Sequence, residues 1–173
     1  MRRILAMLLT AALTAGTIVP AAAVPKEKKV DAEKVLNLIN DYREKDGFDI
    51  VSMGGLTWGL IKMVAKSSAS EEDRKALEVL DGLNRFVVVE YHGADTNARD
   101  AFSRKAEEIL DGVERIIEIK EGGETMNIYG TLSKDGKLIK DIIIFVPEDC
   151  SLLCFMGSID TESLGEVVKM TNE

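Results

Sequence analysis

Two stretches of the sequence repeat one pattern, in which the end of a helix runs through Asp-Gly into a strand. They are EVLDGLNRFVVVEY (residues 78–91) and EILDGVERIIEIKE (residues 108–121), and YREKDGFDIVS (residues 42–52) is a looser third copy. Glycine readily takes the positive φ that ends a helix, so Gly47, Gly82 and Gly112 are expected to form three helix-to-strand joints. Three dissimilar copies are too few for a solenoid, which predicts one compact domain.

Apolar residues with helical spacing precede each joint. Asp31 is a plausible N-cap for the first helix, and Ser70 with Asp73 resembles a capping box for the second. The third helix follows Thr96, and a final helix starts at Asp160. The apolar positions of the four helices, in chain order, are Val35, Leu38, Ile39 and Tyr42; Ala76, Leu77 and Leu80; Ala98, Ala101, Phe102, Ala106, Ile109 and Leu110; and Leu164, Val167 and Val168. We interpret these stripes as core faces.

From Val113 onward the apolar residues alternate instead, as they do in strands. Gly122-Gly123 and SKDG (residues 133–136) are hairpin signals, and the segments 138–146 and 152–159 complete a four-stranded antiparallel meander. Residues 86–89 are apolar on both sides, which is typical of a central strand.

These segments predict an α+β fold with a mixed six-stranded sheet that ends in the four-stranded antiparallel meander. The joints at Gly82 and Gly112 bound a strand-helix-strand crossover, which is the expected source of parallel pairing. Alternation in residues 113–132 leaves one face of the sheet to solvent, so the helices are expected to pack mainly on the other face.

The first 23 residues resemble a signal peptide rather than part of the fold. Arg2 and Arg3 precede an uncharged stretch from Ile4 to Val19, and Ala21-Ala22-Ala23 provides small residues for cleavage. The stretch is shorter than the roughly 20 residues of a spanning helix. We expect residues 1–23 to be removed and residues 24–173 to form a single exported, soluble domain, periplasmic or extracellular. No cysteine lies near the cut, so no stable membrane anchor is expected after cleavage.

Charge narrows the possible partners. The whole chain has a formal charge of −8, and loss of Arg2 and Arg3 without any acid would change it to −10. Nucleic acid and anionic lipid both need basic patches to displace counterions, so no nucleic-acid partner is expected.

Cys150 and Cys154 are the two cysteines of the chain. With Cys154 in a strand and Cys150 at its entry, extended geometry separates them by about 13 Å, whereas a disulfide needs Cα atoms within about 7 Å. Zinc needs about four ligands, and His92 is the one histidine available, so no metal site is predicted. We interpret Cys154 as a small buried hydrophobe. Cys150 lies in a turn, and if exposed in an oxidising compartment it could link two chains.

The remaining motifs do not match known catalytic, nucleotide-binding or calcium-binding patterns. EYHGAD offers Glu90, His92 and Asp95 at a strand end, but a catalytic histidine needs a nucleophile or a metal to serve, and a polar surface loop explains the stretch as well. MGGLTWG (residues 53–59) matches neither dinucleotide nor P-loop patterns, and SKDGK and SIDTES are too short for an EF-hand. We therefore predict no catalytic, cofactor-binding or metal-binding residues and no cofactor.

One helical segment, residues 55–65, is apolar nearly all round. Leu56, Leu60, Met63 and Val64 lie on one side, and Trp58 and Ile61 lie on another. Burial under the rest of the domain is the simpler interpretation. The functional alternative is a recognition surface that includes Trp58 and Met63, because aromatic residues and methionine are enriched in interface cores.

The order of these segments resembles the bacterial family DUF4252. The resemblance rests on DGFDIVSMGG leading into an apolar helix, VLDGLNRFVVVE, MNIYG, LIKDIIIFV and the ending LLCFMGSIDTESLGEV, and it covers residues 30–170. It implies a regulatory or surface role, since members are encoded near envelope sigma-factor systems, and it assigns no reaction, cofactor or ligand. Some members look lipid-anchored, whereas this chain lacks the necessary cysteine.

Two functions from different classes remain at this point. The first is a non-catalytic exported domain of the bacterial envelope that binds a protein partner, such as an envelope protein, or a small ligand. The alternative is a hydrolase-type enzyme that uses dispersed carboxylates such as Glu90 and Asp95 with His92, because residues distant in sequence can converge in space.

Overall fold

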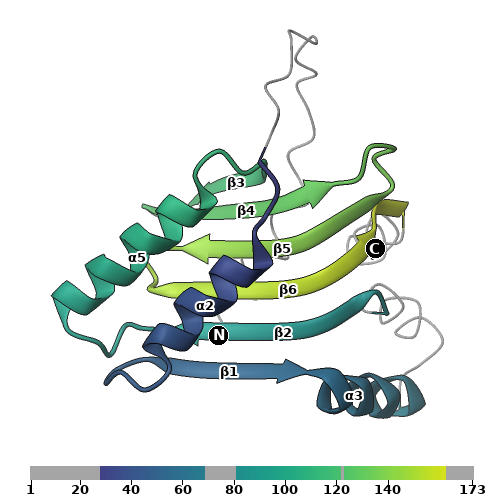
Figure 1. Cartoon of the computed structure of the whole chain (residues 1–173), viewed down its shortest axis with the longest axis horizontal. Helices are drawn as coiled ribbons and strands as arrows, with labels where there is room; N and C mark the ends of the chain where they lie inside the picture. Colours follow the sequence, from purple (N-terminus) through teal and green to yellow (C-terminus); the bar gives the residue numbers. More distant parts are fainter. Residues whose placement is uncertain (1–27, 69–80, 122, 163–173) are drawn as a thin grey trace, which may run out of the picture.

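The computed structural model of the chain describes residues 28–68, 81–121 and 123–162 (Figure 1). Six strands and three helices are formed within these residues. In chain order they are α2 (Ala32–Tyr42), β1 (Asp49–Gly54), α3 (Gly55–Ser68), β2 (Leu83–Glu90), α5 (Thr96–Leu110), β3 (Arg115–Glu121), β4 (Glu124–Leu132), β5 (Leu138–Val146) and β6 (Ser151–Asp160). Several expected features lie outside the described residues: the leader 1–23, the capping box at Ser70 and Asp73 with its helix, and Leu164, Val167 and Val168.

The six strands form one sheet in the order β1-β2-β6-β5-β4-β3 (Figure 1). The α+β fold, the six strands and the β3-to-β6 meander are therefore confirmed. The sheet differs from the expected mixed sheet because every neighbouring pair of these strands is antiparallel. The crossover through α5 does join two strands of the same direction, β2 and β3. They are not neighbours, because β6, β5 and β4 lie between them.

Aspartate side chains cap the starts of α2 and α5. As expected, the Asp31 carboxylate caps α2 by accepting a hydrogen bond from the backbone N–H of Lys34 at 3.1 Å. Asp95 caps α5 in the same way, accepting from the Ala98 N–H at 3.0 Å. Such a cap satisfies one of the donors that a helix start leaves unpaired. The last described helical turn begins directly after Asp160, whose carboxylate accepts from the Glu162 N–H at 2.9 Å.

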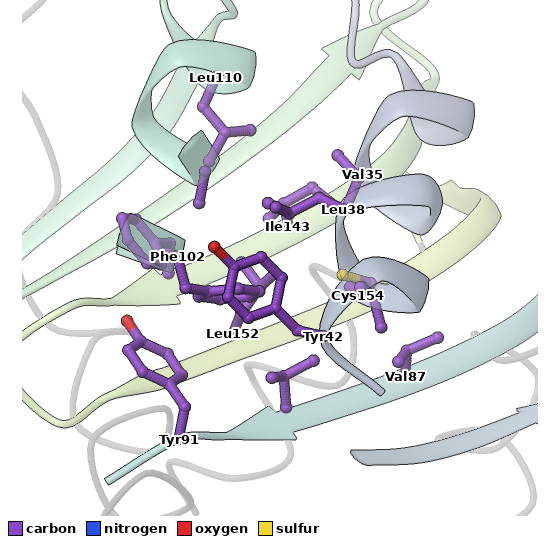
Figure 2. Close-up of a cluster of buried hydrophobic side chains, with 14 of the residues drawn as sticks. Val35, Leu38, Tyr42, Val87, Tyr91, Phe102, Leu110, Ile143, Leu152 and Cys154 are labelled. Carbon is purple, nitrogen blue, oxygen red and sulfur yellow. The ribbon is translucent and has the colours of Figure 1, made fainter. Parts of the chain in front are cut away.

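α2 and α5 lie on the same face of the sheet (Figure 1). Their apolar stripes bury Val35, Leu38, Ile39 and Tyr42 from α2 and Phe102, Ala106 and Leu110 from α5. These side chains meet the inward residues of β2, β5 and β6 in one core (Figure 2). Four rings of this core, those of Tyr42, Phe48, Tyr91 and Phe102, pack with centroids 4.7–5.8 Å apart. Aromatic contacts of this kind add to the stabilisation from area burial.

The opposite face of the sheet is apolar as well, which corrects the expectation of a wet face. It carries a second buried cluster: Trp58, Leu83, Met126, Ile139, Ile142, Ile144, Val146 and Ile159. The cause lies in β5, where Ile142, Ile144 and Val146 point to one face while Ile143 and Phe145 point to the other. Alternation in β3 and β4 predicted one wet face, but the central strands are apolar on both.

Two joints have the expected glycine geometry, and one does not. Gly47 and Gly112 have φ of +78° and +73°, in the left-handed region that glycine tolerates. Gly82 is not among the glycines with positive φ, so that part of the expectation is wrong. A Cβ at Gly82 would lie 2.1 Å from the carbonyl oxygen of Ser158, so glycine is needed there for the close approach of β6.

Candidate functional site

The residues of the enzyme alternative have separate surroundings. Asp95 uses its carboxylate to cap α5, and its backbone carbonyl accepts from the Arg99 N–H at 3.0 Å. His92 lies exposed in the turn between β2 and α5, and Glu90 is the half-buried last residue of β2. Capping gives Asp95 a structural role, and His92 is exposed to solvent. The geometry therefore adds no support to catalysis at this loop.

Between Glu90 and His92, Tyr91 is buried and belongs to the core beneath α5. Its hydroxyl lies 2.9 Å from the Ser103 hydroxyl, and either group can be the donor. Burial raises the pKa of Tyr91 to about 12, with the Ser103 hydrogen bond acting in the opposite direction. Tyr91 is thus neutral at physiological pH and serves as a core residue with one satisfied polar atom.

The two cysteines are free thiols in different environments. Cys154 lies in β6 between Val87 of β2 and Ile143 of β5, fully buried (Figure 2), and burial raises the pKa of its thiol above the ordinary value. Its interpretation as a buried hydrophobe is confirmed. Cys150 is half-buried in the turn before β6 and has a φ of +49°. Its carbonyl accepts from the Tyr91 N–H at 2.9 Å, which joins the turn to the end of β2.

Two open clefts flank α5. The first, of about 250 Å³, lies between α2 and α5 and is lined by Lys34, Asn37, Leu38, Asp41, Lys105, Glu108 and Ile109. The second, of about 330 Å³, lies at the end of α5 and is lined by Glu107, Leu110, Asp111, Gly112, Val113, Arg115 and Tyr129. Both mix opposite charges with solvent-facing helix surface. Over the described residues, the acidic, histidine and cysteine side chains form no group of three that could hold a metal ion.

The helix α3 is anchored to the sheet by one side. The Trp58 indole is buried, its Nε1–H donates to the Leu83 carbonyl oxygen at 3.0 Å, and its ring lies 6.0 Å from that of Phe86. The Lys62 ammonium donates to the Asp81 and Leu83 carbonyl oxygens at 3.1 and 3.0 Å. Trp58 and Lys62 are one helical turn apart, so this side of α3 faces the start of β2.

The opposite side of α3 presents apolar side chains to solvent. Leu56, Leu60, Met63 and Val64 are 89%, 57%, 61% and 63% exposed. Positions i, i+4, i+7 and i+8 share one helical face, so these four residues form a continuous strip, which we name the α3 stripe. Burial is confirmed for Trp58, so the expected recognition surface is wrong in including it, whereas Met63 is exposed.

The edge strand that precedes α3 also exposes an apolar side chain. β1 is an edge strand, and its Val51 side chain is 50% exposed. From Ile50 to Ile61 the chain has no charged residue, although 30% of all residues are charged. The exposed side chains of Val51, Leu56 and Leu60 lie within this uncharged run.

A family model matches residues 42–167 and carries the description domain of unknown function (DUF4252). The chain belongs to the DUF4252 family. The matched DUF4252 region begins at the last residue of α2 and contains all six strands with α3 and α5. No curated protein and no solved structure matches the chain. Membership therefore confirms the resemblance and leaves the function of this DUF4252 domain to be argued from its surface.

Sequence reasoning found part of this DUF4252 surface. The four residues of the stripe share a side in the helical pattern of the sequence. The pattern does not show which side of the helix faces the sheet, since Trp58 and the stripe are equally apolar.

Among the described residues, none of the helices has the length and apolar character that a bilayer-spanning segment needs.

Proposed function

We propose that this DUF4252 chain is an exported, non-catalytic domain of the bacterial cell envelope that binds a partner protein through the α3 stripe. The observation that carries the proposal is the exposure of Leu56, Leu60 and Met63 on a helix whose other side is fixed to the sheet. Burying one such side chain gives about 1.5–3 kcal/mol. Burial of three or four such side chains therefore contributes favourably to association, against a cost of about 4–15 kcal/mol for lost freedom of motion.

The composition of the surface indicates the chemistry of the partner. Residues 55–61 of α3 carry no charge, so the contacting part of the partner is expected to be apolar and uncharged as well. The stripe is convex, being one face of a helix, and it suits a groove or an apolar helix of another protein better than it suits a small ligand, which needs a concave site. A protein partner is therefore favoured over a small ligand.

Export is supported by the sequence of the leader. A positive start, an uncharged apolar stretch and three alanines at residues 21–23 are the parts of a signal peptide. The hydrolase-type alternative has less support, because Asp95 caps a helix and His92 is exposed. The exposed α3 stripe and the structural role of Asp95 in its loop both favour binding over catalysis.

The proposal is tested with the protein comprising residues 24–173, immobilised and exposed to solubilised envelope proteins. Leu60→Asp with Met63→Asp places two charges in the stripe and should abolish capture of any protein that the wild-type chain retains. Ile117→Asp is the matched control, since Ile117 is an exposed apolar residue on the far edge strand β3. Equal capture by the wild type and the double variant, with both folded by circular dichroism, would contradict the proposal.

A further inference from the structure

The two edges of the sheet differ in how they are protected from pairing with another strand. The β3 edge has a bulge between Arg115 and Ile117, and Glu118 forms ion pairs with Arg115 and Lys120. Lys28 adds an isolated bridge to Val113 just before β3. Bulges, charges and covering segments are the devices by which proteins block edge strands. The β3 edge is therefore protected.

Within residues 28–68, 81–121 and 123–162, the β1 edge has none of these devices. Its six residues pair with β2 in an uninterrupted register from Asp49–Glu90 to Gly54–Arg85. Asp49 is its one charged residue, and it contains no proline or lysine. In the described part of the chain, the main-chain hydrogen bonds of β1 go to β2. Because alternate N–H and C=O groups of an edge strand point outward, this edge is a template for another extended strand.

Figure 1 shows that α3 continues beyond the end of β1 and leaves the length of the strand uncovered by the labelled elements. Val51, at the middle of the strand, is half exposed. An incoming strand therefore meets main-chain groups and an apolar side chain, with a single carboxylate at one end.

The β1 sequence can pair with itself without placing like charges opposite each other. Antiparallel pairing centred on Val51 places Val51 against Val51 of a second copy and Asp49 against Met53. Residues 49, 51 and 53 point to the same face of a strand, so the two sheets would join with matching faces. The two Asp49 carboxylates would lie about 13 Å apart along the strands, beyond the Debye length of roughly 8 Å at physiological salt. Repulsion between the two Asp49 carboxylates is therefore weak at this edge.

We infer that β1 pairs antiparallel with β1 of a second copy of this chain, forming a two-fold symmetric dimer with one continuous sheet. Such an isologous contact is the commonest kind of homodimer interface. Self-association at β1 is separate from partner binding at α3, because the two surfaces use different residues and can be disrupted one at a time.

The first experiment measures the molar mass of the chain 24–173 by light scattering or sedimentation over a wide concentration range. Wild type should pass from monomer to dimer as concentration rises, and Val51→Lys should weaken self-association by about tenfold or more, because two like charges would face each other. Ile117→Lys on the β3 edge is the matched control and should dimerise like wild type. A wild type that stays monomeric throughout, or a Val51→Lys variant that dimerises equally well, would overturn the inference.

A second experiment does not depend on the stability of Val51→Lys. In a Cys150→Ser background, Val51→Cys should form a disulfide-linked dimer with oxidised glutathione faster than Ile117→Cys does, since only the former pairs thiols across the two-fold axis. Equal rates for the two variants would overturn the β1 contact. Capture of envelope proteins by the Val51→Lys variant reports separately on α3, so the failure of one proposal leaves the other measurable.

Discussion

At the scale of single residues, Cys150 and Cys154 show how position sets the behaviour of one side chain. Both are free thiols, but Cys154 is enclosed by three central strands, whereas Cys150 lies half-buried in a turn. The thiolate is the reactive form of cysteine, and burial raises the pKa of the Cys154 thiol. Reactivity toward thiol reagents should therefore belong to Cys150 alone.

Titration with a thiol reagent checks this prediction. The native protein is expected to react at one thiol per chain, and the second should react only after unfolding. Cys150→Ser is the control, and its native form should be unreactive. Rapid modification of both thiols in the folded wild type would show that Cys154 is not enclosed as the structure has it.

Tyr91 gives a second prediction, about alkaline pH. Burial raises its pKa in the folded state to about 12, above the value of about 10 for an exposed tyrosine. The unfolded chain therefore loses the proton first, so the free energy of unfolding should fall as pH rises from about 10 to 12, by an amount of order 2 kcal/mol. Below pH 10 the contribution is fully present.

Chemical denaturation at a series of pH values measures the effect. In Tyr91→Phe this part of the fall in the free energy of unfolding at alkaline pH should be absent, because phenylalanine has no ionisable proton. At neutral pH the same variant should be less stable by about 0.5–1.5 kcal/mol, through loss of the contact with Ser103. Parallel pH profiles for the wild type and Tyr91→Phe would argue against a buried phenol.

At the scale of elements, α3 is the part of the chain that sequence patterns describe least well. It has apolar residues on both sides, and its inner side is set by two contacts with Leu83, from Trp58 and from Lys62. Those contacts depend on where β2 begins relative to α3. A local pattern holds no information about that distance, so the exposed stripe becomes visible only in the folded domain.

Two substitutions on this one helix should have very different effects. Trp58→Asp places an unpaired charge in the second core cluster and should lower the free energy of unfolding by more than about 3 kcal/mol. Leu60→Asp changes an exposed position and should alter stability by no more than about 0.5 kcal/mol. Denaturant unfolding of both variants makes the comparison. Similar losses in the two would mean that the outer side of α3 is also covered.

At the scale of the whole molecule, β6, the last described strand, is central to the sheet. β6 pairs with both β2 and β5, so it connects the β1–β2 pair to the β5-β4-β3 part of the sheet. Its two faces supply residues to both cores, Leu152 and Met156 to one and Ile159 to the other. The domain is complete only when this segment is in place, and folding through such distant contacts is expected to be slow.

The signal peptide expected at residues 1–23 leads to a prediction about the N-terminus of the exported protein. Expressed in a bacterial host with export machinery, the chain should be recovered from outside the cytoplasm with Val24 or a close neighbour as its first residue. Intact-mass spectrometry gives the terminus directly. Ala23→Phe removes a small residue next to the cut and should leave the leader attached. A wild-type product that retains residues 1–23 would refute cleavage.

What the sequence determined by itself is local. The cap at Asp31, the hairpin between β4 and β5, the strand limits of β5 and β6, and the buried Cys154 all follow from residues within a few positions of one another. Turn chemistry and side-chain periodicity act over that range, so a single sequence is sufficient to predict them.

What only the tertiary structure decided is non-local. The place of β6 between β2 and β5, the burial of the second face of the sheet, the outward side of α3 and the open edge of β1 each depend on which distant segments meet. Which segments meet depends on the packing free energy of the whole domain. A short stretch of sequence therefore does not contain the information needed to predict it. Gly82 is an example at a single position. Glycine is required there because the Ser158 carbonyl, 76 positions away in the sequence, leaves no room for a side chain.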